Sequence, residues 1–372
     1  MKIVTVVGAR PQFIKSAPVS KVLQIGGHEE FLIHTGQHYD YNMSKIFFEE
    51  MGIVAPDINL EVGSGDHGRQ TGHMIIRIEE VLKSEKPDWV LVYGDTNSTL
   101  AGALAAVKLH IPVAHVEAGL RSFNKRMPEV INRVMTDRIS NLLFCPSQQA
   151  VDNLLSEGIG RIDKPLSAIV ETFDKPAKVV MVGDVMYDSF LFWQKHAGKH
   201  VDVQGVSLPS SFILATIHRP ENTDDRNKLS LLIKTLGEVG KKFNPVVIPI
   251  HPRTQKRLDE YAIKVPERIM LLPPVSYQQM IGLLDRCQLV ITDSGGLQKE
   301  AYFSKKCCIT LRDQTEWIET VDSGVNLIAG TEPDLIIPGV GRFISDNNIR
   351  SFPPLYGHGD ASIKVVKALL EF

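Results

Sequence analysis

The chain lacks a long hydrophobic run and has no excess of either charge. None of its apolar runs approaches the ~18 residues of a membrane span, and the N-terminal MKIVTVVGARPQ has too few apolar residues before Gly8 for a signal peptide. Lys and Arg number 41 and Asp and Glu 43, a net charge of −2. This balance excludes the broad basic surface of a protein that binds nucleic acid or a membrane, although it allows a local basic pocket.

Cysteine is also scarce. The four cysteines, Cys145, Cys287, Cys307 and Cys308, form no CxxC pair and have none of the spacings of zinc ligands. We therefore expect free thiols and a cytoplasmic location. With 372 residues, 43% hydrophobic and 23% charged, the chain has the composition of a globular protein, and at this length we expect two domains.

Several cofactor signatures are missing. The chain has no Walker A sequence and no GxSxG elbow. A GxGxxG string at 63–68 follows a short polar segment rather than a buried strand, so we expect no dinucleotide site there. The histidine pairs His34/His38 and His110/His115 do not have the spacing of a helical metal pair, so we expect no metal site.

Short β-branched runs alternate along the chain with stretches of helical spacing, a pattern that indicates parallel sheets covered on both faces. Six runs in each half predict the α/β class, with two Rossmann-like, doubly wound domains that face each other across one cleft. The runs are Ile3–Val7, Phe31–His34, Trp89–Tyr93, Val113–Val116, Leu142–Phe144 and Val179–Val182, then Phe212–Ile217, Val246–Ile250, Ile269–Leu272, Leu289–Thr292, Cys308–Leu311 and Asn326–Ile328.

The junction between the domains is expected in a charged stretch with two prolines, near 160–178. We therefore assign residues 1–170 to an N-terminal domain and 178–355 to a C-terminal, nucleotide-binding domain. Residues 360–372 have the pattern of an amphipathic helix that could pack back on either domain, with the N-terminal one as our assignment.

Open α/β sheets bind ligands beyond the carboxyl ends of their strands. The turn 293–296 follows the strand LVIT and precedes the helical stretch LQKEAYF. Its two glycines let a ligand approach the backbone, and the free N–H groups of a helix start suit a phosphate. Glu300, one turn further, is placed to accept hydrogen bonds from a ribose diol. The alternative is an ordinary helix cap with a glycine turn.

Charged residues at other strand ends are further candidates. Four of them could bind phosphate or could each be a surface charge: Arg10, His251, Arg253 and Arg312. Four others could supply a general acid and a general base: Asp95, Glu117, Glu129 and His218. Two of these have simpler interpretations, because Asp95 could cap the following helix and Glu129 lies four residues before Arg133, the spacing of a helical ion pair.

Together these segments resemble the non-hydrolysing UDP-N-acetylglucosamine 2-epimerases, from about residue 1 to about 330. The motifs are GARPQFIK, TGQH, GDTNSTLAGALAA, HVEAGLRS, MPEVINR, HRPEN and TDSGGLQKEA. The resemblance implies the GT-B fold, a homodimer, a UDP-sugar substrate, and no cofactor. Onto this sequence it places the site residues Arg10, Lys15, Gln37, His38, Asp95, Glu117, Arg121, Glu129, Arg133, His218, Glu221, Asn222, Ser294, Gly295, Gly296 and Glu300.

The family's reaction explains why these residue types are needed. Departure of UDP builds positive charge at C1 of the sugar and acidifies the C2 hydrogen. Anti elimination then yields a 2-acetamidoglucal, and protonation of C2 from the other face with return of UDP gives the epimer. The resemblance implies that Asp95, Glu117, Glu129 and His218 are the acid–base groups, and it leaves open which one removes the proton.

The sequence departs from the family pattern at several positions. Gln12 stands where a carboxylate is common, Pro220 replaces an arginine, and QTEWIE at 314–319 replaces TTERPE. The lost arginine argues against allosteric activation by a second UDP-sugar. The variants resemble the branch that acts on UDP-2,3-diacetamido-2,3-dideoxyglucuronic acid, whose C6 carboxylate could meet Lys125 and Arg126, or these two could be solvated.

Three other functions remain open from the sequence. The first is a GT-B glycosyltransferase with the same UDP site, the second a hydrolysing relative that releases the free sugar, and the third a UDP-sugar-binding module without catalysis. A glycosyltransferase needs one catalytic base rather than an acid–base set, so the number of carboxylates and the HRPEN segment argue against it.

Overall fold

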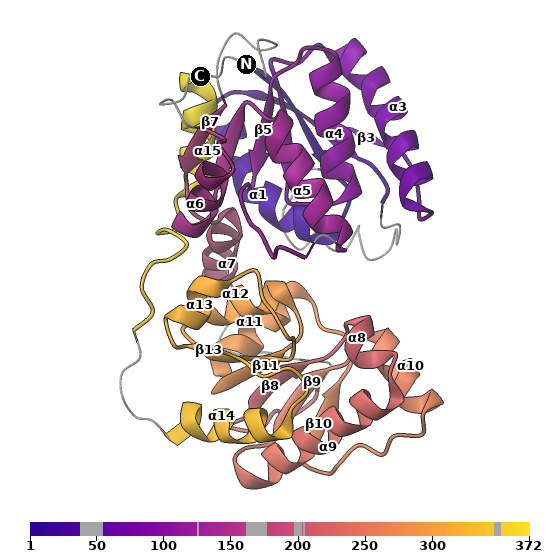
Figure 1. Cartoon of the computed structure of the whole chain (residues 1–372), viewed down its shortest axis with the longest axis vertical. Coiled ribbons are helices and arrows are strands. Elements are labelled where there is room, and N and C mark those ends of the chain that lie inside the picture. Colours follow the sequence, from indigo (N-terminus) through magenta and orange to yellow (C-terminus); the bar gives the residue numbers. More distant parts are fainter. Residues whose placement is uncertain (38–54, 125, 161–176, 197–202, 204, 346–350) are drawn as a thin grey trace. The chain divides into compact units, whose positions relative to one another are not determined.

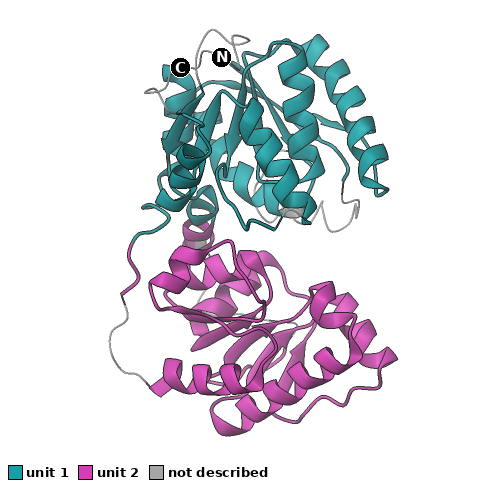
Figure 2. Ribbon diagram, viewed as in Figure 1, with its two compact units in different colours: residues 1–189, 354–372 teal, residues 190–353 magenta. Residues whose placement is uncertain are grey.

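A computed structural model describes residues 1–37, 55–124, 126–160, 177–196, 203, 205–345 and 351–372. The chain forms two compact units, residues 1–189 with 354–372 and residues 190–353 (Figure 2). Each unit contains one parallel sheet with helices on it (Figure 1). The expected α/β class with two doubly wound, Rossmann-like parallel sheets, as in the GT-B fold, is confirmed.

The first unit has a seven-stranded sheet in the order β3-β2-β1-β4-β5-β6-β7. The helices α1 and α3 to α6 connect its strands, and α7 follows the last strand. The elements are β1 (Lys2–Val7), α1 (Arg10–Ile25), β2 (Glu29–His34), β3 (Ile58–Asn59), α3 (His67–Glu85), β4 (Trp89–Tyr93), α4 (Asn97–Lys108), β5 (Val113–Val116), α5 (Pro128–Ile139), β6 (Leu142–Cys145), α6 (Gln148–Ser156), β7 (Lys178–Met181) and α7 (Val185–His196).

The boundary between the units lies inside α7, between Ser189 and Phe190, beyond the stretch 160–178 in which we expected the junction. The reason is that β7 pairs with β6 and extends the first sheet, so the chain leaves this unit one strand later. The two-residue strand β3 was also missed, because two residues are too few to show a pattern.

The C-terminal helix α15 (Ala361–Glu371) lies in the first unit and packs against α1. Asp188 on α7 holds its start, accepting from the backbone N–H groups of Ala361 and Ser362 at 3.2 and 2.7 Å. Burial raises the pKa of this carboxyl group above its ordinary value. These two hydrogen bonds attach the C-terminal helix to the first unit.

The second unit has a six-stranded sheet in the order β10-β9-β8-β11-β12-β13. Its elements are β8 (Ile213–Thr216), α8 (Pro220–Thr223), α9 (Arg226–Lys242), β9 (Val246–Pro249), α10 (Pro252–Glu260), β10 (Ile269–Leu272), α11 (Tyr277–Arg286), β11 (Leu289–Thr292), α12 (Gly295–Phe303), β12 (Cys307–Thr310), α13 (Ile318–Asp322), β13 (Asn326–Ile328) and α14 (Pro333–Ser345).

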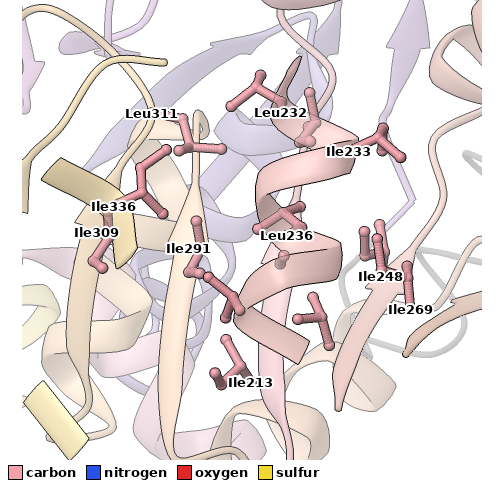
Figure 3. Packing of buried hydrophobic residues seen from close by; sticks show 14 of the residues in the cluster. Ile213, Leu232, Ile233, Leu236, Ile248, Ile269, Ile291, Ile309, Leu311 and Ile336 are labelled. Atoms are coloured by element: carbon pink, nitrogen blue, oxygen red, sulfur yellow. The ribbon is translucent and has the colours of Figure 1, made fainter. Parts of the chain in front are cut away.

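Apolar side chains of α9 fill the core of the second unit (Figure 3). Leu229, Leu232, Ile233 and Leu236 recur at intervals of three and four residues, so they share one helix face, which packs on strand residues such as Ile291. At the N-terminus of α9, the Asp225 side chain accepts from the N–H groups of the first turn. In the described part of the chain, no helix is both long enough and apolar enough to span a membrane.

Candidate active site

In both sheets the first strand of the unit lies between its second and fourth, and the chain reverses direction across the sheet at that point. Such a switch point leaves room for a ligand beyond the carboxyl ends of the strands. In the first unit this edge carries the turns after β1, β4 and β5. In the second unit it carries the turns after β8, β11 and β12.

Lys15 and Glu117 form a buried ion pair at the first edge. Lys15 comes from α1 and Glu117 from the turn after β5, and the Lys15 ammonium contacts Oε2 of Glu117. A Cβ atom on Gly94 would lie 3.5 Å from the ammonium and 3.6 Å from the carboxylate, so the turn after β4 borders the pair. Glu117 has a φ of +71°, a left-handed conformation that costs energy for a residue with a side chain and is common at functional sites.

Asp95 pairs with Arg133, whose guanidinium Nη2 lies 2.7 Å from Oδ2. The interpretation of Arg133 as the helical partner of Glu129 is therefore wrong: Glu129 is exposed in the first turn of α5 and has no hydrogen bond or ion pair to any described residue. The capping alternative for Asp95 is wrong as well, because Thr96 caps α4. The structure thus leaves Asp95 26% exposed and held by one arginine.

Two other predicted residues of the first unit, Gln37 and Arg121, form hydrogen bonds or ion pairs with neighbouring residues of the same unit. Gln37 accepts from the N–H and the hydroxyl of Ser98 at 3.1 and 2.7 Å and so holds the start of α4. Arg121 is only 4% exposed and donates to Asp137 and Glu157, so its guanidinium does not face a ligand in this structure.

A few predicted residues have less structural support. The side chain of Arg10, and all of His38 and Lys125, lie outside the described residues. Arg126 is exposed and has one hydrogen bond, from its own backbone N–H to Asn124.

Sequence reasoning noted Gln12 only as a departure, but this side chain organises the turn after β1. Its Oε1 accepts from the N–H groups of Gly8 and Ala9 at 2.8 and 3.1 Å, and its Nε2 donates to the carbonyl of Tyr93 at 2.8 Å. An ionised carboxylate could not donate that last hydrogen bond. Glutamine therefore suits this position because it links β1 to β4.

Asp293 is the centre of the second edge and was not predicted as a site residue. It is fully buried and accepts from the N–H groups of His218 and Arg219, each at 3.0 Å, and from the Asn222 amide at 3.1 Å. Asn222 also donates to the carbonyl of Leu311 at 3.0 Å. An acidic residue directly after a buried strand was the signal that could have identified Asp293.

The His218 ring is held beside this carboxylate, with Nδ1 3.3 Å from Oδ1 of Asp293, and is 37% exposed. The His251 ring lies 5.8 Å from it, centre to centre. Reduced contact with water, together with the charges of His218 and Arg253, lowers the pKa of His251. Two histidines thus stand at neighbouring strand ends, one of them favouring its neutral form.

Two predicted residues, Ser294 and Arg312, lie at the N-terminus of α12. Ser294 accepts from the N–H of Leu297, as a cap does. Arg312 donates to both oxygens of Glu316, each at 3.0 Å. Burial opposes ionisation of Glu316, but Arg312 outweighs it and lowers its pKa. A Cβ atom on Gly295 would lie 3.8 Å from Arg312, so this arginine is close to the helix N-terminus, where an anion is favoured.

The remaining predicted residues of the second unit differ in their surroundings. Glu300 is buried on α12 at 6% exposure, and Gly296 is half-buried at the start of that helix. Arg253 pairs with Asp224 at the surface, and Glu221 is exposed without a hydrogen bond or ion pair to any described residue. A hollow of about 270 Å³ between α9 and the segment after α10 contains none of the predicted residues.

The arrangement has clear chemical capacities. Ion-paired carboxylates at one edge can accept a proton, and a helix N-terminus with a nearby arginine can hold a phosphate. Among the residues that the structure describes, no three histidine, cysteine or carboxylate side chains are close enough to share a metal ion.

Comparisons with known proteins identify the family. The family model described as UDP-N-acetylglucosamine 2-epimerase matches residues 23–370. The UDP-2,3-diacetamido-2,3-dideoxy-D-glucuronate 2-epimerase of Pseudomonas aeruginosa is 49% identical over 374 residues, 99% of each chain. A UDP-N-acetylglucosamine 2-epimerase of Methanococcus maripaludis is 42% identical over 374 residues, 98% of this chain and 97% of the relative.

A solved structure agrees with this assignment. The UDP-GlcNAc 2-epimerase of Methanocaldococcus jannaschii, in complex with UDP-GlcNAc and UDP, is 41% identical, covers all of both chains and superposes with a TM-score of 0.87. The chain belongs to the UDP-N-acetylglucosamine 2-epimerase family and is an isomerase.

Proposed function

We propose that the protein inverts C2 of a UDP-2-acetamido sugar by anti elimination and re-addition of UDP. The observation that carries the proposal is the pair of ion-paired carboxylates, Asp95 and Glu117, at the switch point of the first sheet. A carboxylate held at this edge can accept the C2 proton as UDP departs. On this proposal the acid–base set consists of Asp95, Glu117, Glu129 and His218.

The UDP-binding role belongs to the second unit. The N-terminus of α12, with Ser294 and its two glycines, would hold the diphosphate, and Glu300 on the same helix would accept from the ribose. His218 follows β8 and Arg312 follows β12, the two strands on either side of β11, which leads into α12. The reaction moves protons and a leaving group but no hydride, so we propose that it needs neither a nicotinamide nor a metal, and that activity survives dialysis against EDTA.

We further propose UDP-2,3-diacetamido-2,3-dideoxyglucuronate as the preferred substrate. The support is the 49% identity over the whole chain to the Pseudomonas aeruginosa relative that bears this name, against 42% to a UDP-N-acetylglucosamine 2-epimerase. We expect kcat/KM to favour the diacetamido uronic substrate over UDP-N-acetylglucosamine by at least about tenfold. Equal or reversed values would contradict this choice but not the reaction.

The reaction itself is tested in deuterated water. Wild-type protein should place deuterium at C2 of the recovered UDP-sugar, because C2 is deprotonated and reprotonated in each turnover. Glu117→Gln and His218→Ala should each lower kcat by about 10²–10⁴-fold, while His73→Gln, at an exposed position of α3, serves as the matched control.

Each alternative function has its own outcome in this assay. Transfer of the sugar to an acceptor without C2 exchange would indicate a glycosyltransferase. Accumulation of free sugar with UDP would indicate a hydrolysing enzyme. Binding of UDP-sugar without exchange in any 2-acetamido substrate would leave a binding module.

We also propose a homodimer in the cytoplasm. The dimer is supported by Ile131 and Met135, apolar residues four apart on α5 that are 51% and 46% exposed. The location is supported by four cysteines that are all free thiols. Light scattering on the purified protein should give twice the chain mass, and Ile131→Glu should shift it toward the monomer.

A further inference from the structure

His115 is a fully buried histidine to which the proposed reaction gives no role. It lies on β5, two residues before Glu117, and its side chain has no exposed surface. Ring Nδ1 lies 2.7 Å from Oδ1 of Asp137, and Nε2 lies 2.7 Å from the carbonyl oxygen of Gly94. The histidine therefore bridges helix α5 and the turn after β4.

Both partners of His115 accept hydrogen bonds. A backbone carbonyl can only accept. The Asp137 carboxylate also accepts from the N–H of Gly119 at 3.2 Å and from Arg121 at 2.7 Å. Burial opposes its ionisation, but the bonds and charges of His115 and Arg121 outweigh burial and lower its pKa. Both ring nitrogens of His115 therefore face hydrogen-bond acceptors, one on each side of the ring.

These bonds hold the two turns that carry Asp95 and Glu117. The Gly94 carbonyl belongs to the peptide that leads into Asp95, and the Gly94 N–H donates to the carbonyl of Val116 at 2.9 Å. Asp137 in turn holds the N–H of Gly119, two residues beyond Glu117. Glu117 has a left-handed backbone with a φ of +71°, which for a residue with a side chain persists only where the surroundings support it. Gly94 at +67° and Gly119 at +81° adopt the same region without that cost, because they have no Cβ atom.

We propose that His115 is a positioning residue for C2 epimerisation, which acts through the Gly94 carbonyl and the Asp95 turn. This inference rests on the proposed function, because it takes Asp95 and Glu117 as acid–base groups. His115 is buried beneath the turns, so it orients these groups without contacting the sugar. Displacement of a catalytic group by about 1 Å can cost 10²-fold in rate, so the loss should fall on kcat rather than on binding.

Two substitutions of His115 distinguish its hydrogen bond to the Gly94 carbonyl from its hydrogen bond to Asp137. In His115→Gln the amide nitrogen stands near the position of Nε2 and can still donate to Gly94, whereas in His115→Asn it stands near Nδ1 and can donate only to Asp137. We expect kcat to fall at least about 30-fold in His115→Asn with KM within about twofold, and to stay within about fivefold of wild type in His115→Gln. His73→Gln is again the control, and the melting temperature and UDP affinity of each variant are measured beside kcat.

Two results would overturn the inference. One is a His115→Asn protein that folds, binds UDP and keeps wild-type kcat. The other is an equal loss of kcat in the two variants, which would remove the role of the Gly94 link. A wild type without C2 exchange on any 2-acetamido substrate would instead refute the proposed function. If the wild type exchanges and His115→Asn matches it, only the positioning role fails.

Discussion

Asp293→Asn tests the organisation of the second unit, because one buried carboxylate holds three donors from the β8 turn. The donors are the backbone N–H groups of His218 and Arg219 and the amide of Asn222. A hydrogen bond to a charged acceptor contributes about 1 kcal/mol more than one to a neutral acceptor. Three such bonds weaken in the variant, so we expect a loss of ~3 kcal/mol in the free energy of unfolding of this unit.

Tryptophan fluorescence can follow the second unit alone. Of the three tryptophans, Trp193 and Trp317 lie in it and Trp89 in the first unit. A Trp89→Phe background removes the tryptophan of the first unit, so the fluorescence then reports on the second unit, residues 190–353. For a unit of this size, ~3 kcal/mol corresponds to a fall of about 6–12 °C in the melting temperature. Asp322→Asn, at an exposed position at the end of α13, is the matched control.

The same substitution should also lower kcat, since the backbone that carries His218 loses its anchor. We expect a reduction of at least about tenfold, measured as C2 deuterium exchange. A variant within about 1 kcal/mol of wild type in stability, with unchanged kcat, would show that the three hydrogen bonds do not set this turn.

Three further predictions follow from single features. Although burial acts in the opposite direction, hydrogen bonds from His115 and Arg121 lower the pKa of Asp137 below its ordinary value of 3.8. The ionised carboxylate therefore stabilises the fold above pH 3.8, and this stabilisation is lost as the pH falls below that value. Urea unfolding from pH 6 to pH 3 should show this loss in the wild type and a flatter profile in Asp137→Asn. Gly119→Ala should destabilise by at least about 2 kcal/mol, because Gly119 has a φ of +81° and a Cβ atom would lie 2.3 Å from the Ala150 carbonyl; a soluble variant with unchanged melting temperature would contradict this. Trp317→Leu should cost about 1–2 kcal/mol, because the buried Lys299 ammonium lies 4.2 Å over its ring; Trp317→Phe should restore part of the loss.

The helix pattern was readable because burial is periodic. Stretches with helical spacing at 72–84, 99–110 and 229–243 correspond to α3, α4 and α9, and the C-terminal amphipathic stretch corresponds to α15. Their apolar residues recur on one face regardless of what that face packs on. The helix α14, from Pro333 to Ser345, is harder to read from the sequence, because Pro338 lies inside it and obscures the pattern.

The positions of two candidate site residues could be read from the sequence because a residue type and a strand end coincide. Asp95 and Glu117 follow buried strands, so their place at the edge of a parallel sheet could be expected from the sequence. The ion-pair partners of these carboxylates could not be predicted. Lys15 lies 102 residues from Glu117 along the chain. For Arg133, the sequence offered Glu129 on the same helix as a possible partner, whereas the structure pairs it with Asp95.

The sequence by itself determined the two parallel sheets, the strand ends that carry polar residues and the resemblance to a family, because these depend on local periodicity and on motifs read in order. Only the tertiary structure decided which charges are neutralised. The buried pairs His115–Asp137 and Lys15–Glu117, and the Asp293 carboxylate with its three donors, join residues far apart in the chain. A charge can be buried only when a partner compensates its lost hydration, and no local pattern specifies that partner.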